Sequence, residues 1–292
     1  MSNNENYSDY QDYFFQTKSI KEDPQFLRNL LDNLNINLKS LEEYVKNIQK
    51  LKNVVCNDRL DYLINIQLVG GAINYLYNEY LSKYINNQNI FYFIDDKEIE
   101  EFYNHLNKLN GIFENMIFDY IYFKLLDYNF SGDKVIENYK KIIEDNLRII
   151  VNNKEILLSY NNYNNKNGYI IKIQYAYKNL YHLLFTFRLI FSEVALSIDS
   201  NQSSNNNLED NDQEYDKLKY SMLEYNFKIE NLYIKNCLFN HYNKEDMKNI
   251  LNNLYESFDH LSFSLIYLYS RIKEKVTEIL NKSDNFMVYR YI

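Results

Sequence analysis

The sequence predicts an all-α fold, an elongated antiparallel coiled-coil bundle of three long, kinked helices. Glycine and proline, which punctuate strands and tight turns, occur only five times and once in 292 residues. Apolar residues recur at steps of three and four over most of the chain, which is the period of a helix face. The first such row is a narrow heptad seam that one helix cannot bury alone, so we expect two chains to dimerise into a six-helix bundle.

The first helix is predicted to begin at Asp23 and Pro24, a cap residue followed by a proline suited to the first turn. Its seam consists of Leu27, Leu31, Leu34, Leu38, Leu41, Val45, Ile48, Leu51 and Val55, and it continues through Leu63, Ile66, Val69, Ile73, Leu76 and Tyr80. The spacing therefore predicts one helix over about 23–84. Gly70 and Gly71 lie inside it and indicate close helix packing or a kink, because no strand and no GK[ST] motif accompany them.

The second and third helices follow the same periodicity. Asp95 or Asp96 caps the second helix, whose apolar row is interrupted near Gly132, where we expect a kink. The stretch 161–168 predicts a chain reversal into the third helix, which runs to Ile198. Helical patterns return over 215–239 and, after a cap at Asn243, from Met247 to about Leu280.

These patterns divide the chain into one domain with three segments outside its core. We expect a flexible polar N-terminal tail at 1–22, a helical domain over 23–282 with a disordered acidic insertion at 200–212, and a frayed C-terminus at 283–292. The insertion contributes no core, and protein partners would bind there.

Composition restricts the classes of function. The net charge of -8 argues against binding to nucleic acid. The N-terminus has no basic head followed by an apolar core, and no apolar run reaches the length of a membrane span. The two cysteines, Cys56 and Cys237, fit a reducing compartment, so we expect a cytoplasmic protein.

Residues with catalytic or metal-binding chemistry are scattered. The four histidines, His105, His182, His241 and His260, stand in no metal-binding spacing, so we expect no metal and no cofactor. Cys237 and His241 are four residues apart and would share a helix face, but nucleophilic catalysis also needs an orienting group and an oxyanion site. The sequence shows neither, and it predicts that the protein is not an enzyme.

Basic residues concentrate around the predicted reversal between the second and third helices. The stretch 134–178 holds eight lysines and arginines against four acidic residues, a local charge of +4. In a long bundle this reversal lies at one tip, where basic side chains would meet an anionic phospholipid surface. Our candidate lipid contacts are Lys140, Lys141, Arg148, Lys154, Lys166 and Lys172. These lysines are equally compatible with ordinary solvated helix positions, and the sequence does not decide between the two.

Three segments resemble the BAR modules found in Arf GTPase-activating proteins with pleckstrin-homology domains. The stretch KEDPQFLRNLLDNLNINLKSLEEYVKNIQKL at 21–51 is similar to the acidic, Leu-rich start of their first helix. The stretches FRLIFSEVALSI at 187–198 and SFDHLSFSLIYLYSRIKEKV at 257–276 are similar to the third helix and its aromatic end. The acidic insertion and the negative net charge depart from the family.

The resemblance implies a homodimeric scaffold that lies peripherally on a cytosolic membrane face and senses or shapes its curvature. The alternative is a structural coiled-coil subunit of a cytoskeletal or tethering complex that does not bind lipid.

Overall fold

The computed structural model describes residues 23–86, 88–118, 134–202 and 243–288. Within these ranges the chain is all-α, with six long helices and no strand. The helices are α2 (Pro24–Leu51), α3 (Arg59–Leu76), α5 (Asp96–Met116), α7 (Lys134–Ser159), α8 (Lys166–Gln202) and α11 (Lys244–Val288). A π-helical turn, Tyr77–Leu81, the short α4, Ser82–Ile85, and a 3-10 helix, η2, Gln88–Phe93, connect α3 to α5. The prediction of an all-α fold is confirmed.

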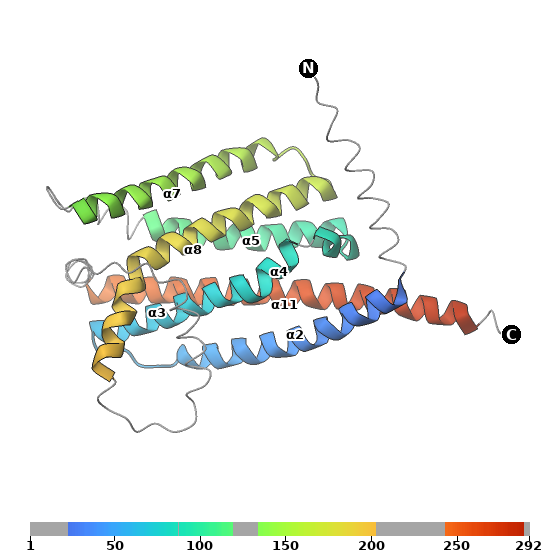
Figure 1. The fold of residues 1–292 in the computed structure, drawn as a ribbon, viewed down its shortest axis with the longest axis horizontal. Coiled ribbons are helices and arrows are strands. Elements are labelled where there is room, and N and C mark those ends of the chain that lie inside the picture. The colour runs from blue at the N-terminus through green and yellow to red at the C-terminus, as the bar shows by residue number, and fades with distance from the viewer. Residues whose placement is uncertain (1–22, 87, 119–133, 203–242, 289–292) are drawn as a thin grey trace, which may run out of the picture.

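The long helices run up and down beside one another (Figure 1). The longest, α11, packs against α2, α3 and α5, and α8 packs against α3, α5 and α7. As a result α3 and α5 lie between α11 and α8, while α7 forms one edge of the bundle (Figure 1). The C-terminal part of α8 bends away from the direction of its first part (Figure 1).

The prediction of one helix over 23–84 is wrong, because the chain turns back between α2 and α3. Asp58 caps the new helix: its Oδ1 accepts a hydrogen bond from the backbone N–H of Asp61 at 2.9 Å. The Asp61 carboxylate in turn accepts from the backbone N–H of Asn57 at 2.8 Å. Val55, which the heptad pattern includes in the seam, lies in this turn and is 76% exposed.

The reversal allows both halves of the seam to pack within one chain. Leu27, Leu34 and Leu41 of α2 are buried in the same apolar core as Ile66 and Ile73 of α3. Both helices pack on α11. The seam itself therefore needs no second chain to cover it.

Most other predicted boundaries agree with the structure. The Asp23 side chain caps α2 and accepts from the backbone N–H of Gln25 at 2.9 Å, and Asp95 caps α5. The predicted reversal near 161–168 lies between α7 and α8, and α8 includes residues 200–202 of the expected insertion. At the other end α11 continues to Val288, past the expected limit of 282. The predictions for 1–22, Gly132, 203–212 and 215–239 fall outside the described residues.

Gly70 is a site of close helix packing, as its sequence context predicts. A Cβ atom at this position would lie 2.6 Å from Cε1 of Phe187 on α8. The Phe187 ring is buried and makes an edge contact with Phe113 of α5, with centroids 6.3 Å apart. The ring has little room to move, so only glycine permits this approach of α3 to α8. Gly111 of α5 differs, since its Cβ would meet no atom within 4 Å.

We expect Gly70→Ala to lower the free energy of unfolding by about 1–2 kcal/mol, because overpacking exceeds the gain in helix propensity. The matched variant Gly111→Ala should raise it by about 0.5–1 kcal/mol, since it gains the propensity without a clash. Urea unfolding followed by circular dichroism measures both. Equal effects of the two substitutions would contradict the packing argument.

Tyrosines fill much of the core, and several of their hydroxyl groups are hydrogen-bonded there. The hydroxyl of Tyr269 on α11 donates to the backbone oxygen of Tyr80 at 3.1 Å, and its ring contacts Tyr84, with centroids 4.4 Å apart. Burial raises the pKa of Tyr269, and it raises the pKa of Tyr255 to about 12. The folded chain therefore holds these phenols in the neutral form.

This burial predicts unfolding at alkaline pH. An unfolded tyrosine ionises near pH 10, so above that pH the unfolded state loses protons that the folded state keeps. The tyrosine contribution to stability is complete below about pH 10 and is lost as the pH rises toward the folded pKa. The urea midpoint should fall as the pH increases above about 10. Tyr269→Phe should make that fall shallower, and an unchanged slope would contradict the assignment.

Candidate functional site

Two of the predicted lipid contacts lie on the exposed surface of α7. Lys141 is exposed, and Arg148 is exposed with its Nη1 atom 3.3 Å from Oδ1 of Asp145, one turn away on the same helix. Lys140 lies in α7, but its side chain is outside the described part of the structure. A solvent-exposed pair of this kind contributes little to stability, so Arg148 is available to another partner.

Lys154 of α7 is engaged with a neighbouring helix. Its Nζ donates to Oε1 of Glu114 on α5 at 2.7 Å. The Lys154 side chain remains 55% exposed, whereas that of Glu114 is 22% exposed. Helix α7, which packs against α8, is thus also connected to α5. The bridge neutralises the charge of Lys154, one of the predicted lipid contacts.

Lys166 and Lys172 of α8 are used to dock α8 on the start of α5. Lys166 Nζ donates to the backbone oxygen of Ile94 at 2.7 Å, and burial lowers its pKa despite the nearby Asp96 and Asp95 carboxylates. Lys172 is only 4% exposed, and its Nζ lies 4.5 Å from the ring centroid of Tyr169 on the same helix and 5.8 Å from that of Tyr103 on α5. These contacts are a backbone hydrogen bond and a cation–π interaction inside the bundle.

The five predicted contacts whose side chains the structure describes therefore do not gather on one surface. Lys141 and Arg148 face outward from α7, Lys154 bridges to α5, and Lys166 and Lys172 are partly or fully buried. The sequence pattern located the basic stretch but did not indicate which lysines the fold uses internally.

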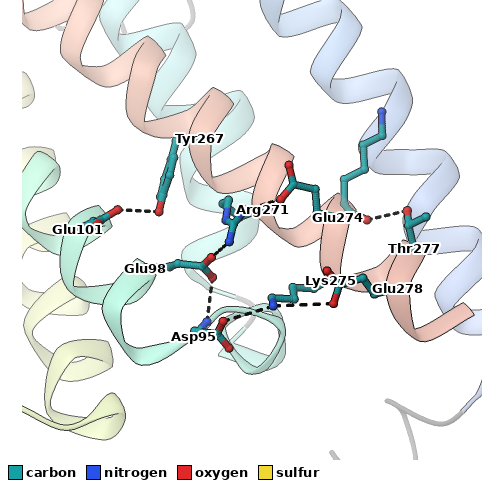
Figure 2. Close-up of polar contacts among 10 residues, drawn as sticks. Asp95, Glu98, Glu101, Tyr267, Arg271, Glu274, Lys275, Thr277 and Glu278 are labelled. Carbon is teal, nitrogen blue, oxygen red and sulfur yellow. Dashed lines mark hydrogen bonds and ion pairs between the residues drawn. The ribbon is translucent and has the colours of Figure 1, made fainter. Parts of the chain in front are cut away.

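A polar cluster that the sequence did not predict joins the start of α5 to α11 (Figure 2). The Glu98 carboxylate accepts from the backbone N–H of Asp95 at 3.0 Å and from the guanidinium of Arg271. Arg271 also donates to Glu274, and Lys275 Nζ lies 3.3 Å from Oδ2 of Asp95. The Glu98 carboxylate thus caps α5 and also pairs with Arg271 across the interface, and its side chain is 9% exposed.

Tyr267 extends this cluster by one turn of α11 (Figure 2). Its hydroxyl donates to Oε2 of Glu101 at 2.8 Å. Burial and this hydrogen bond to a carboxylate raise the pKa of Tyr267 to about 12. On the same interface, the His105 ring meets Phe263 edge-on with centroids 5.1 Å apart. The groups are arranged as fixed helix contacts, with each carboxylate already paired.

Candidate catalytic and metal-binding groups remain dispersed where the structure describes them. In that part of the chain, no set of three or more His, Cys, Asp or Glu side chains could hold a metal ion. His182 Nδ1 lies 3.0 Å from Oδ1 of Asn146 on α7, and burial lowers its pKa. Cys237 and His241 fall outside the described residues.

The described residues also include exposed large apolar side chains. Four of them lie on α7: Ile142 at 40%, Ile149 at 40%, Val151 at 45% and Leu158 at 59%. Others lie elsewhere, such as Ile36 of α2 at 67% and Phe263 of α11 at 56%. An edge helix with this composition provides an apolar surface for a partner.

Comparisons with protein-family models, with curated proteins and with solved structures give no match to this chain. Among the described helices, none combines the length and apolar character that crossing a bilayer requires. The site is therefore interpreted from its own geometry.

We expect Glu98→Gln to lower the free energy of unfolding by about 1–2 kcal/mol, because it removes the charge of the nearly buried carboxylate that pairs with Arg271 and leaves this arginine with the exposed Glu274. Glu278→Gln on α11 is the matched control, since Glu278 is 57% exposed and only 3.8 Å from Lys275. The control should change stability by less than about 0.5 kcal/mol. Thermal and urea unfolding measure both, and similar losses would show that the Glu98–Arg271 pair has no special role.

Proposed function

We propose that this chain is a structural helical subunit that acts by holding other protein chains along its surface. The observation that carries the proposal is the exposed aliphatic residues of α7, with Ile142 and Ile149 on one side of its buried row and Val151 and Leu158 on the other side. Exposed aliphatic residues repeated along an edge helix are typical of a surface that receives another helix.

The distribution of positive charge supports a protein partner over a lipid one. Lys154, Lys166 and Lys172 make contacts within the chain. Of the described candidate side chains, this leaves Lys141 and Arg148 for headgroups, each contributing about 1 kcal/mol at an anionic surface. The net charge of -8 on the whole chain opposes that attraction. A surface of this kind binds anionic vesicles weakly.

The second candidate is a dimeric BAR-like scaffold on a membrane, with a curved helical surface that recognises or shapes the bilayer. One observation favours it. Lys141 and Arg148 lie next to Ile142 and Ile149 on α7, and amphipathic helices at membrane interfaces combine basic and aliphatic residues in this way. In this case α7 would lie against the headgroups.

Co-sedimentation with phosphatidylserine-rich vesicles at low ionic strength separates the two candidates, since screening is weakest there. We expect the full chain to stay in the supernatant. Lys141→Glu with Arg148→Glu should then behave like the unmodified chain, as should Lys248→Glu on the exposed side of α11. Strong pelleting that Lys141→Glu and Arg148→Glu abolish, and Lys248→Glu does not, would replace the first candidate with the second.

A further inference from the structure

Helix α7 carries two separate apolar rows, of which the fold uses one. The first row, formed by Ile143, Leu147, Ile150 and Leu157, is buried, and α7 packs against α8. The second row places an aliphatic residue at every seventh position: Val135, Ile142, Ile149 and Ile156. Residues seven apart lie within about 20° of each other around a helix, so the second row forms one stripe. Each of Ile142, Ile149 and Ile156 stands one residue before a member of the first row, so the two rows lie on different sides of the helix. Ile142 and Ile149 are exposed.

The second row has the pattern of a coiled-coil seam. Its members and the polar residues between them, Ile142, Asp145, Ile149, Asn152 and Ile156, follow one another at steps of three and four. Asp145 and Asn152 are exposed. Polar residues inside such a seam cost stability but fix the register and orientation of the partner helix. The row is therefore suited to one helical partner in one register.

We infer that a second copy of this chain covers the row, with the two α7 helices antiparallel across a two-fold axis. The inference rests on the proposed function and names the partner. We place the two-fold axis at the level of the Asp145–Asn146 peptide bond. Because the row is evenly spaced, Ile142 then lies opposite Ile149 of the partner subunit, and the two-fold symmetry produces the same contact with the two copies exchanged. The aliphatic residues of both copies meet along the whole row without a change of register.

The charged residues beside the row are complementary in the same arrangement. Asp145 and Arg148 are both exposed, with side chains 51% and 72% accessible. Across the axis Arg148 lies about two residues, or 3 Å, along the helix from Asp145 of the partner subunit. Symmetry repeats this pair, so each interface contains two Arg–Asp contacts of opposite charge. A carboxylate in the middle of the row disfavours an anionic bilayer as the occupant.

The experiment is a charge exchange between two variants of the full chain, with mass measured by light scattering during size-exclusion chromatography. The unmodified protein should have twice the 35.5 kDa of one chain. Asp145→Arg places four arginines around the axis and Arg148→Asp places four carboxylates there, so each variant alone should dissociate at least about tenfold more readily. Mixing the two variants in equal amounts should restore the dimer, because every cross-axis pair is again of opposite charge.

Two controls distinguish loss of this interface from unfolding and from a general effect of charge. Lys248→Asp reverses an exposed charge on α11 and should stay dimeric. Circular dichroism should show each variant folded, since both changed residues are exposed. A monomeric unmodified chain, or a dimer that survives both single variants, or single variants whose mixture stays monomeric, would each overturn the inference. If the unmodified chain is a monomer and does not bind vesicles, the proposed structural role is retained with a different partner. If it binds vesicles and the double variant Ile142→Gln with Ile149→Gln does not, both the dimer and the proposed structural role are overturned.

Discussion

The apolar face of α11 is the constraint on which the rest of the structure depends. Its 45 residues would extend about 67 Å at 1.5 Å per residue, and buried apolar side chains occur along it from Met247 to Leu280. One narrow helix stripe cannot cover so wide a face. Three helices, α2, α3 and α5, share it. The turn between α2 and α3 allows these two amphipathic helices, which are consecutive in sequence, to pack side by side against α11.

The polar contacts between helices follow from this packing. Once α5 lies on α11, the Glu98 carboxylate is nearly buried, and it is stabilised by the Arg271 guanidinium and the backbone N–H of Asp95. Lys166 contacts the backbone oxygen of Ile94 just before α5, and Lys172 contacts the Tyr103 ring of α5. The Lys166 ammonium group donates to a backbone carbonyl, and that of Lys172 lies over aromatic rings. Lys154, Lys166 and Lys172, which the sequence suggests as contacts for an external ligand, are therefore engaged within the fold.

Helix α7 lies at one edge of the bundle and packs against α8 (Figure 1). Its inner row is buried, whereas Ile142 and Ile149 of its second row are exposed. An exposed row at heptad spacing contributes nothing to the fold of one chain, yet it is the surface that association with a further helix requires. This division between an internal core and an external seam is why we assign the chain a structural role.

The sequence alone determined the helical class and most of the helix starts. Glycine and proline are scarce, and apolar residues follow the helix period. Asp23 and Asp95 cap helices through contacts with residues two or three positions away, so the helix starts can be predicted from the local sequence. The break at 52–58 was also encoded locally, by Asp58 and Asp61, but the apolar spacing continued through Val55 and concealed it. Only the tertiary structure decided which charges are internal and which row stays exposed, because Lys172, Glu98 and Ile142 all read as ordinary helix residues. Their burial depends on which helix lies opposite, and periodicity specifies that a face must be covered without specifying by what.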